Sequence, residues 1–131
     1  MNYKVLCAFI LTFLCSTLYA FELDVTFPQG VPEKLDFAYG ISTGDCSNPN
    51  SIKCHFTQSK LGGIDSAHII QYLQSINALF KTMTPVADKF HKPTNYIEMK
   101  VPGKTGMCSI EVLGKAKISV AMNKNGGCTI K

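Results

Sequence analysis

The stretch YIEMKVPGKTGMCSIEVLGKAKISVAM, residues 96–122, decides the fold predicted for this chain. Apolar residues alternate with polar ones in it, which is typical of half-buried strands. Pro102-Gly103 is the residue pair expected at the centre of a type II turn, so a hairpin is predicted here. A four-residue connection at 102–105 keeps the apolar side chains on one face and pairs Met99 with Cys108 and Ile97 with Ile110.

The next connection follows the same rule. A two-residue turn at Gly114-Lys115 would set Val112 across from Lys117 and mix buried with solvated positions. A three-residue connection at 113–115 instead opposes Glu111 to Lys117 on the wet face, a favourable cross-strand pair. The sequence therefore predicts a three-stranded antiparallel meander over about 96–122, with the further pairs Val112 with Ala116, Ile110 with Ile118 and Cys108 with Val120.

A helix is predicted before the meander, over about 66–83. Asp65 or Ser66 is available as its N-cap, and apolar residues recur at spacings of three and four. In a chain this short such a stripe is core rather than a membrane or partner surface. We expect this helix to cover the meander in a two-layer α+β domain. The stripe is Ile69, Tyr72, Leu73, Ile76, Phe80 and Met83.

The remaining segments are predicted from their turn residues. Residues 21–27 alternate like a strand, whose place in the sheet the sequence leaves open. Residues 28–63 contain three Pro and five Gly, which favours loops with one short strand at 35–41. Thr84-Pro85 would start a second short helix through Phe90. After a turn at 123–127, Cys128 is expected to fold back and begin a last short strand through Ile130.

Residues 1–20 have the layout of a secretory signal peptide. A basic start precedes an apolar run over 5–18, which is too short for a membrane span, and cleavage is expected near Ala20. A lipoprotein acylated at Cys15 fits less well, because Phe13 and Leu14 stand where small residues are expected; an uncleaved anchor is the other alternative. The prediction is a protein exported to the periplasm or beyond, with one small domain over 21–131.

Four cysteines remain after the signal peptide: Cys46, Cys54, Cys108 and Cys128. An even number in an exported chain predicts two disulfides. Three pairings are possible, and the simplest joins Cys46 to Cys54 and Cys108 to Cys128. A zinc site that adds His55 is disfavoured because no C-x-x-C pair is present, so no metal is expected.

Charge is uneven along the chain. All 13 basic residues are lysine; residues 21–80 carry three of them against six acidic residues, and residues 81–131 carry nine against three. Without arginine's rigid fork, sequence-specific nucleic-acid binding is not expected. Lysines acting as point charges still suit an anionic surface, the alternative being a face that serves solubility alone.

Motifs for catalysis are missing from the sequence. It contains no nucleophile elbow, zincin motif, phosphate loop or calcium loop. His55, His68 and His91 have no carboxylate pair close to them in sequence, and nothing orders Ser59 with Lys60 and His55. We therefore expect a non-enzymatic protein without a cofactor.

The signal peptide, the size, the cysteine pattern and the lysine-only basic character resemble small orphan exported proteins of bacteria, such as the type II secretion substrates of intracellular pathogens. This resemblance implies a secreted effector or adhesion-type role. It carries no functional residue over to this chain.

Two functions from different classes are predicted. The first is a secreted binding module that contacts an anionic lipid head group, acidic glycan or acidic protein through its lysine-rich half, at Lys100, Lys104, Lys115, Lys117 and Lys124. The second is a small secreted enzyme inhibitor or hydrolase that uses the disulfide-braced loop at 42–63.

Overall fold

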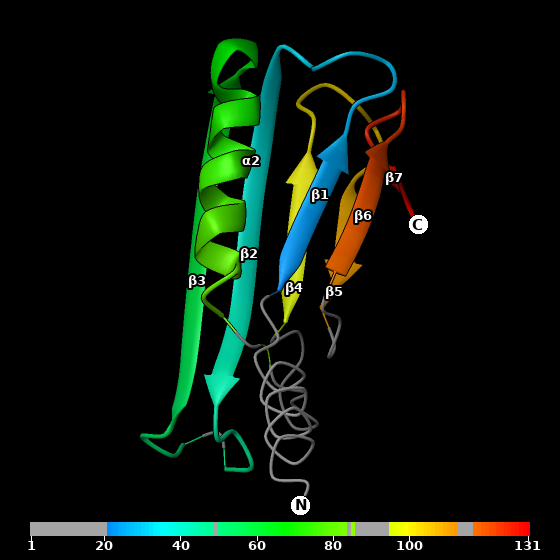
Figure 1. The fold of residues 1–131 in the computed structure, drawn as a ribbon. Coiled ribbons are helices and arrows are strands. Elements are labelled where there is room, and N and C mark those ends of the chain that lie inside the picture. Colours follow the sequence, from blue (N-terminus) through cyan, green and yellow to red (C-terminus); the bar gives the residue numbers. More distant parts are fainter. Residues whose placement is uncertain (1–20, 49, 84, 86–94, 113–116) are drawn as a thin grey trace, which may run out of the picture.

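The structure is a computed structural model that describes residues 21–48, 50–83, 85, 95–112 and 117–131. One helix and seven strands lie in this part of the chain (Figure 1). In chain order they are β1 (Glu22–Thr26), β2 (Lys34–Gly44), β3 (Cys54–Asp65), α2 (Ser66–Phe80), β4 (Tyr96–Lys100), β5 (Cys108–Glu111), β6 (Lys117–Met122) and β7 (Cys128–Ile130). The predicted α+β class is confirmed.

Four antiparallel strands form the larger sheet, in the order β3-β2-β4-β5. The β4–β5 hairpin has the predicted register, with Ile97 opposite Ile110 and Met99 opposite Cys108. Its turn matches the Pro-Gly prediction, since Gly103 has a φ of 85° and the Lys104 N–H donates to the Val101 carbonyl at 3.1 Å.

The prediction that β6 forms the third strand of the meander is wrong. β6 lies in a second sheet of order β1-β6-β7, where it pairs in parallel with β1 and antiparallel with β7. Ile118 and Val120 therefore lie opposite Leu23 and Val25, and Lys117 lies opposite Glu22 instead of Glu111. Alternation is satisfied equally by both partners, so the pattern of β6 alone does not choose between them.

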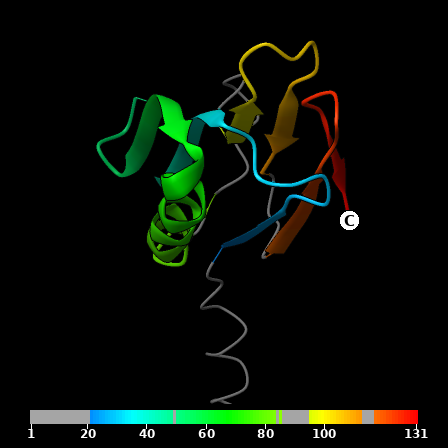
Figure 2. The same ribbon diagram turned by 90° about the horizontal axis from the view of Figure 1, so that it is seen from above.

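The apolar face of the larger sheet must be buried, and β6 helps to bury it as part of the smaller sheet. In Figure 2 α2 and the smaller sheet lie side by side on one face of the larger sheet. α2 packs against β1, β2 and β3, so the expectation that it covers the meander is wrong; β1 and β6 cover β4 and β5 instead (Figure 1). The larger sheet, α2 and the smaller sheet contribute to one hydrophobic core. It includes Phe37, Ile97, Ile110, Ile76 and Val120.

The helix stripe is confirmed, and the helix ends earlier than the predicted residue 83. Ile69, Ile76 and Phe80 are buried, and Tyr72, Leu73 and Met83 pack at the edge of the core. Asp65 occupies the N-cap without a side-chain cap hydrogen bond, while the Ser66 N–H donates to the Glu33 carbonyl at 2.9 Å. No helix in the described part of the chain is long and apolar enough to cross a membrane.

Within residues 28–63 the structure has a long hairpin of β2 and β3 where loops with one short strand were predicted; the predicted strand at 35–41 lies within β2. β2 and β3 run side by side from Lys34–Asp65 to Gly44–Cys54, with a register shift between Leu35 and Phe37. The glycines that suggested loops have places within it. A Cβ at Gly40 would lie 2.5 Å from the Tyr96 ring and 2.8 Å from the Phe56 ring, so two aromatic side chains cover that backbone.

Disulfides join Cys46 to Cys54 and Cys108 to Cys128, which is the simplest of the three pairings. The first closes the tip of the β2–β3 hairpin, and the second connects β5 of the larger sheet to β7 of the smaller. Two disulfides in one small chain indicate an oxidising compartment outside the cytoplasm. β7 also confirms the predicted return of the chain at Cys128.

Several predictions concern residues outside the described part of the chain. These are the signal peptide over 1–20, the second short helix through Phe90, the connection at 113–115, and the residues His91 and Lys115.

Candidate functional site

The five candidate lysines do not form one patch in the structure. Lys100 lies in β4 opposite Asp36, and Lys117 begins β6 opposite Glu22. Lys115 lies outside the described residues. Only Lys104 and Lys124 border the same pocket. The lysine-rich half of the sequence is therefore divided among surfaces that the sequence could not distinguish.

Lys104 and Lys124 belong to two of the three connections that meet at one end of the molecule. Figure 1 shows the links β1–β2, β4–β5 and β6–β7 at the same end of the two sheets. Each begins at a turn with a backbone hydrogen bond: Gly30 N–H to Phe27, Lys104 N–H to Val101, and Gly126 N–H to Asn123, at 3.0 to 3.1 Å. We call this place the loop end.

A pocket of about 360 Å³ lies at the loop end, within the size range of small-ligand sites. Apolar side chains from the β1–β2 and β4–β5 connections and from the end of β6 line it, and Met122 of β6 is buried. The polar groups at its border are the two lysines, the Glu33 carboxylate, Gln29 and Asn123. The apolar lining residues are Phe27, Val31, Pro32, Val101 and Met122.

The two lysine-bearing turns are held together through their backbones. The Gly106 N–H donates to the Asn125 carbonyl at 2.8 Å, and a Cβ at Gly126 would lie 2.9 Å from the Gly106 carbonyl oxygen. The Cys108–Cys128 disulfide follows directly after both turns and ties the same two chain segments covalently. The spacing of Lys104 and Lys124 is therefore set before any ligand binds, which lowers the entropy lost on binding.

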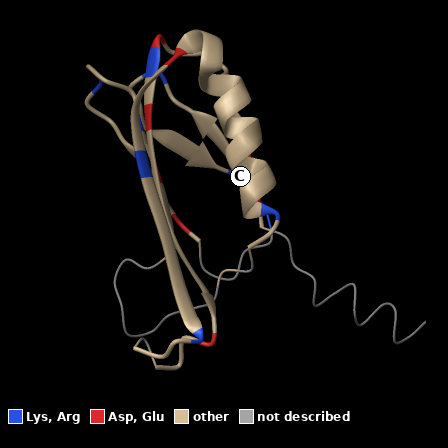
Figure 3. Ribbon diagram, turned by 90° about the vertical axis from the view of Figure 1, so that its left-hand side faces the viewer, with Lys and Arg blue, Asp and Glu red and all other residues tan. Residues whose placement is uncertain are grey.

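A second, smaller pocket of about 230 Å³ lies on the outer face of the larger sheet. Lys60 and Lys100 line it, and so do Asp36 and Glu98. Figure 3, which looks onto the β3 edge of this sheet, shows lysine and acidic positions interspersed along the β2–β3 hairpin. Equal numbers of lysine and carboxylate side chains do not favour an anion, so Lys100 is not brought into an anionic site.

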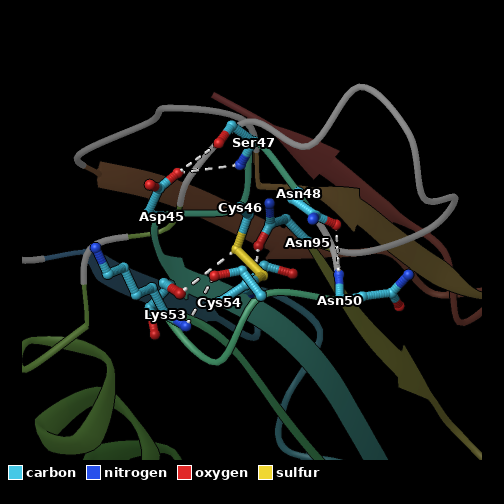
Figure 4. Close-up of a disulfide and its surroundings, with 11 residues drawn as sticks. Asp45, Cys46, Ser47, Asn48, Asn50, Lys53, Cys54 and Asn95 are labelled. Atoms are coloured by element: carbon cyan, nitrogen blue, oxygen red, sulfur yellow. Dashed lines mark hydrogen bonds between the residues drawn. A yellow bond between two sulfur atoms is a disulfide. The ribbon is translucent and has the colours of Figure 1, made fainter.

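The hairpin tip, described at residues 45–48 and 50–53, is the other feature with functional character (Figure 4). The Cys46–Cys54 disulfide closes it, and the Asp45 carboxylate accepts hydrogen bonds from the Ser47 hydroxyl at 2.8 Å and the Ser47 N–H at 3.2 Å. These bonds lower the pKa of Asp45 below its ordinary value of 3.8. Ile52 projects from this braced tip with 91% of its surface exposed.

Asn95, the residue before β4, joins the end of β2 that leads into the tip to the body of the protein. The side-chain oxygen of Asn95 accepts from the Ser42 N–H at 2.8 Å, and its carbonyl accepts from the Val112 N–H at 2.8 Å. Asn95 and Ser42 are both buried. Asn95 could not be predicted from the sequence, since a single Asn after a proline-containing segment carries no pattern.

The residues weighed for hydrolase chemistry are separated in the structure. β2 pairing places Ser59 and His55 on the core side of β3, opposite Tyr39 and Thr43, and Lys60 on the outer side, opposite Ala38. Four residues along a strand separate Ser59 from His55 by about 13 Å. Within the described ranges no three His, Cys, Asp or Glu side chains gather into a possible metal site.

The apolar wall of the loop-end pocket was also missed. The turns at Pro28-Gly30, Pro102-Gly103 and 123–127 were each recognisable, but their meeting depends on the parallel β1–β6 pairing. A search of protein-family models, curated proteins and solved structures found no match to the chain.

Proposed function

We propose that this protein binds an anionic lipid head group at the loop end. The observation that carries the proposal is that Lys104 and Lys124, from two separate turns fastened to each other, border one apolar-lined pocket. Ammonium groups suit a phosphate or carboxylate, and the apolar wall suits the adjoining hydrocarbon. The combination favours a lipid over an acidic glycan or protein, whose surfaces near the charge are polar.

The proposal includes export from the cytoplasm. The two disulfides support an oxidising compartment, and the sequence pattern of residues 1–20 supports a cleaved signal peptide. Amino-terminal sequencing of the exported protein tests this part, with Phe21 expected as the first residue. Under this proposal the protein meets its lipid on a membrane surface outside the cytoplasm, as the resemblance to secreted effectors implies.

Binding is tested with short-chain, water-soluble phosphatidylglycerol as the probe and the matching phosphatidylcholine as the neutral comparison. The expected result is saturable binding of phosphatidylglycerol to the oxidised protein, measured by calorimetry, that weakens between 50 and 300 mM salt. The double variant Lys104→Gln/Lys124→Gln is expected to bind about thirtyfold more weakly, because each lysine near an anionic lipid contributes about 1 kcal/mol.

The matched control is Lys100→Gln/Lys117→Gln, which removes the same net charge from other surfaces. It is expected to bind as the wild type does. Equal weakening by both double variants would mean that only net charge matters and would refute a site at the loop end. Binding of heparin or an acidic peptide in place of the lipid would assign the loop end to a different ligand.

The hairpin tip supports a second candidate function, an inhibitor-like docking loop. Ile52 is nearly fully exposed on a turn that a disulfide and local hydrogen bonds hold in one shape. Preorganised loops with an exposed apolar anchor are suited to a pocket on a partner protein. In a panel of secreted proteases, Ile52→Ser is expected to abolish any inhibition, whereas the neighbouring Lys53→Gln is expected to retain it; full inhibition by Ile52→Ser would exclude this candidate.

A further inference from the structure

The outer edge of β3 is the longest unpaired strand edge in the described part of the chain. β3 has 12 residues and is the terminal strand of the larger sheet. All nine residues from His55 to Gly63 are exposed, and Phe56 and Leu61 are among the exposed large apolar side chains. Exposed edges offer free N–H and C=O groups to another strand.

The hydrogen bonding at the end of the β2–β3 ladder shows which β3 residues direct their backbone N–H and C=O groups away from β2. The Asp45 N–H donates to the Lys53 carbonyl at 3.0 Å, which makes 45 and 53 a hydrogen-bonded pair. Such pairs alternate along an antiparallel ladder, so His55, Thr57, Ser59 and Leu61 bond to β2. Phe56, Gln58 and Lys60 therefore direct their backbone groups outward.

The devices by which proteins usually protect an edge are sparse here. Between Cys54 and Leu61 there is no proline, and the single full charge is Lys60. Figure 3 faces this edge and shows a long, unbroken ribbon. β3 departs from regular strand geometry only beyond Leu61, where the register against β2 shifts and Gly63 has a φ of 68°. The regular and accessible edge is thus the segment 54–61.

We propose that β3 pairs antiparallel with β3 of a second copy of this chain, centred on Gln58. In an antiparallel pairing about a two-fold axis, the core-side faces of both copies lie on the same side of the joined sheet. Directly opposed residues must then point to the same side, so their residue numbers add up to an even number. Centring on Gln58 uses seven residue pairs within the regular segment and opposes Thr57 to Ser59 and Phe56 to Lys60. The two Lys60 ammonium groups then lie apart, each beside an aromatic ring of the other copy.

The sequence of this edge favours a second copy as the occupant. The sequence FTQSK, residues 56–60, is nearly complementary to itself when two copies run antiparallel about Gln58. The hydroxyl residues Thr57 and Ser59 then face each other, and the ring of Phe56 faces the aliphatic stem of Lys60. Centring on Ser59 would carry the pairing into the irregular Gly62-Gly63 end, and centring on Lys60 would oppose two like charges. The result is a two-fold dimer with a continuous eight-stranded sheet, formed on the side of the molecule away from the loop end (Figure 1).

The proposal is tested by sedimentation of the oxidised protein over 5 to 500 µM. The wild type is expected to be dimeric at the upper concentrations, and Gln58→Lys, which opposes two lysines at the two-fold axis, is expected to raise the dimer dissociation constant at least tenfold. The control Gln74→Lys adds the same charge on the exposed side of α2 and is expected to leave it unchanged. A monomeric wild type at 500 µM, or equal dimerisation by Gln58→Lys, would overturn the proposal.

The register is tested by introduced cysteines. Gln58→Cys places two sulfur atoms at a directly opposed position, within the Cα separation that a disulfide requires, and is expected to crosslink the dimer on mild oxidation. In Thr57→Cys the two introduced residues are offset by two positions along the strand and are expected to crosslink far more slowly. Crosslinking of Thr57→Cys in preference to Gln58→Cys would refute the register.

Discussion

The side-chain oxygen of Asn77 in α2 accepts a hydrogen bond from the backbone N–H of Leu23 in β1 at 2.9 Å. β1 is the edge strand of the smaller sheet, so this N–H points away from its neighbour β6. Leu23 is buried, and Asn77 is half-buried between helix and strand. The helix therefore completes the hydrogen bonding of a strand that it also packs against.

Asn77→Ala is expected to lower the free energy of unfolding by about 1–3 kcal/mol, because the Leu23 N–H would be left buried without its partner. Urea denaturation followed by circular dichroism measures the change. Gln74→Ala, one turn away on the exposed face, is expected to change stability by less than about 0.5 kcal/mol. A loss at Asn77 no larger than that at Gln74 would contradict the structural role of this bond.

Local patterns predicted the parts of the fold that depend on nearby residues. The spacing of Ile69, Ile76 and Phe80 determined α2, and Pro102-Gly103 determined the β4–β5 hairpin. Asn77 lies outside the apolar stripe, and its role depends on β1, where its partner Leu23 is 54 residues away in the sequence. Helical periodicity predicts the direction in which a side chain points, and tertiary packing decides whether that side of the helix is exposed to solvent.

Pairings between distant segments could not be predicted in the same way. The match of Ile118 to Leu23 in β1 is as good as its match to Ile110, so alternation could not choose the sheet. The loop-end pocket depends on that choice, because β1–β6 pairing brings the turn after Phe27 beside Lys124. The site was therefore predicted as two separate lysines in a longer set, without its apolar wall.

The two disulfides are expected to differ in their contribution to stability. The Cys46–Cys54 bond closes a separation of 8 residues at the hairpin tip, and the Cys108–Cys128 bond closes 20 and links the two sheets. Loop-closure entropy predicts about 2.5 kcal/mol for the first and about 3.3 kcal/mol for the second. Removing buried Cys108 adds a packing loss, so the double alanine variant there is expected to be the less stable of the two.

Thermal unfolding of the two double alanine variants, Cys46→Ala/Cys54→Ala and Cys108→Ala/Cys128→Ala, measures this order. The tip variant is expected to keep a cooperative transition, since Asn95 still anchors the hairpin. If the tip variant were the less stable protein, the hairpin tip rather than the connection between sheets would be the more important constraint.

The titration of Asp45 reports on the structure of the hairpin tip. Its pKa is lowered first by the Ser47 hydroxyl and second by the Ser47 N–H, both of which bond the ionised form. A lowered folded-state pKa stabilises the fold above the ordinary value of 3.8, and that contribution is lost as the pH falls through the folded-state value.

Ser47→Ala is expected to raise the pKa of Asp45 part of the way to its ordinary value, because the backbone bond remains. Carboxyl carbon chemical shifts between pH 2 and 6 measure the change. Ser51→Ala, which removes a hydroxyl that accepts from the Lys53 N–H in the same tip, is expected to leave the Asp45 titration unchanged. An unchanged titration in Ser47→Ala would show that its hydroxyl does not bond the carboxylate in solution.

Gly106 is expected to tolerate no side chain without a change in the loop end. A Cβ there would lie 2.6 Å from the Gly127 nitrogen and 2.8 Å from the Asn125 carbonyl oxygen, and neither backbone atom can move without its turn. Gly106→Ala must therefore separate the turns that bear Lys104 and Lys124, which we expect to cost about 1–3 kcal/mol of stability and to weaken phosphatidylglycerol binding. Gly103→Asn is the control: its φ is 85°, which Asn tolerates, and a Cβ there meets no described atom within 4 Å. Chemical denaturation and calorimetry on both variants measure the two effects, and wild-type binding by a destabilised Gly106→Ala would show that the spacing of the two turns does not control the site.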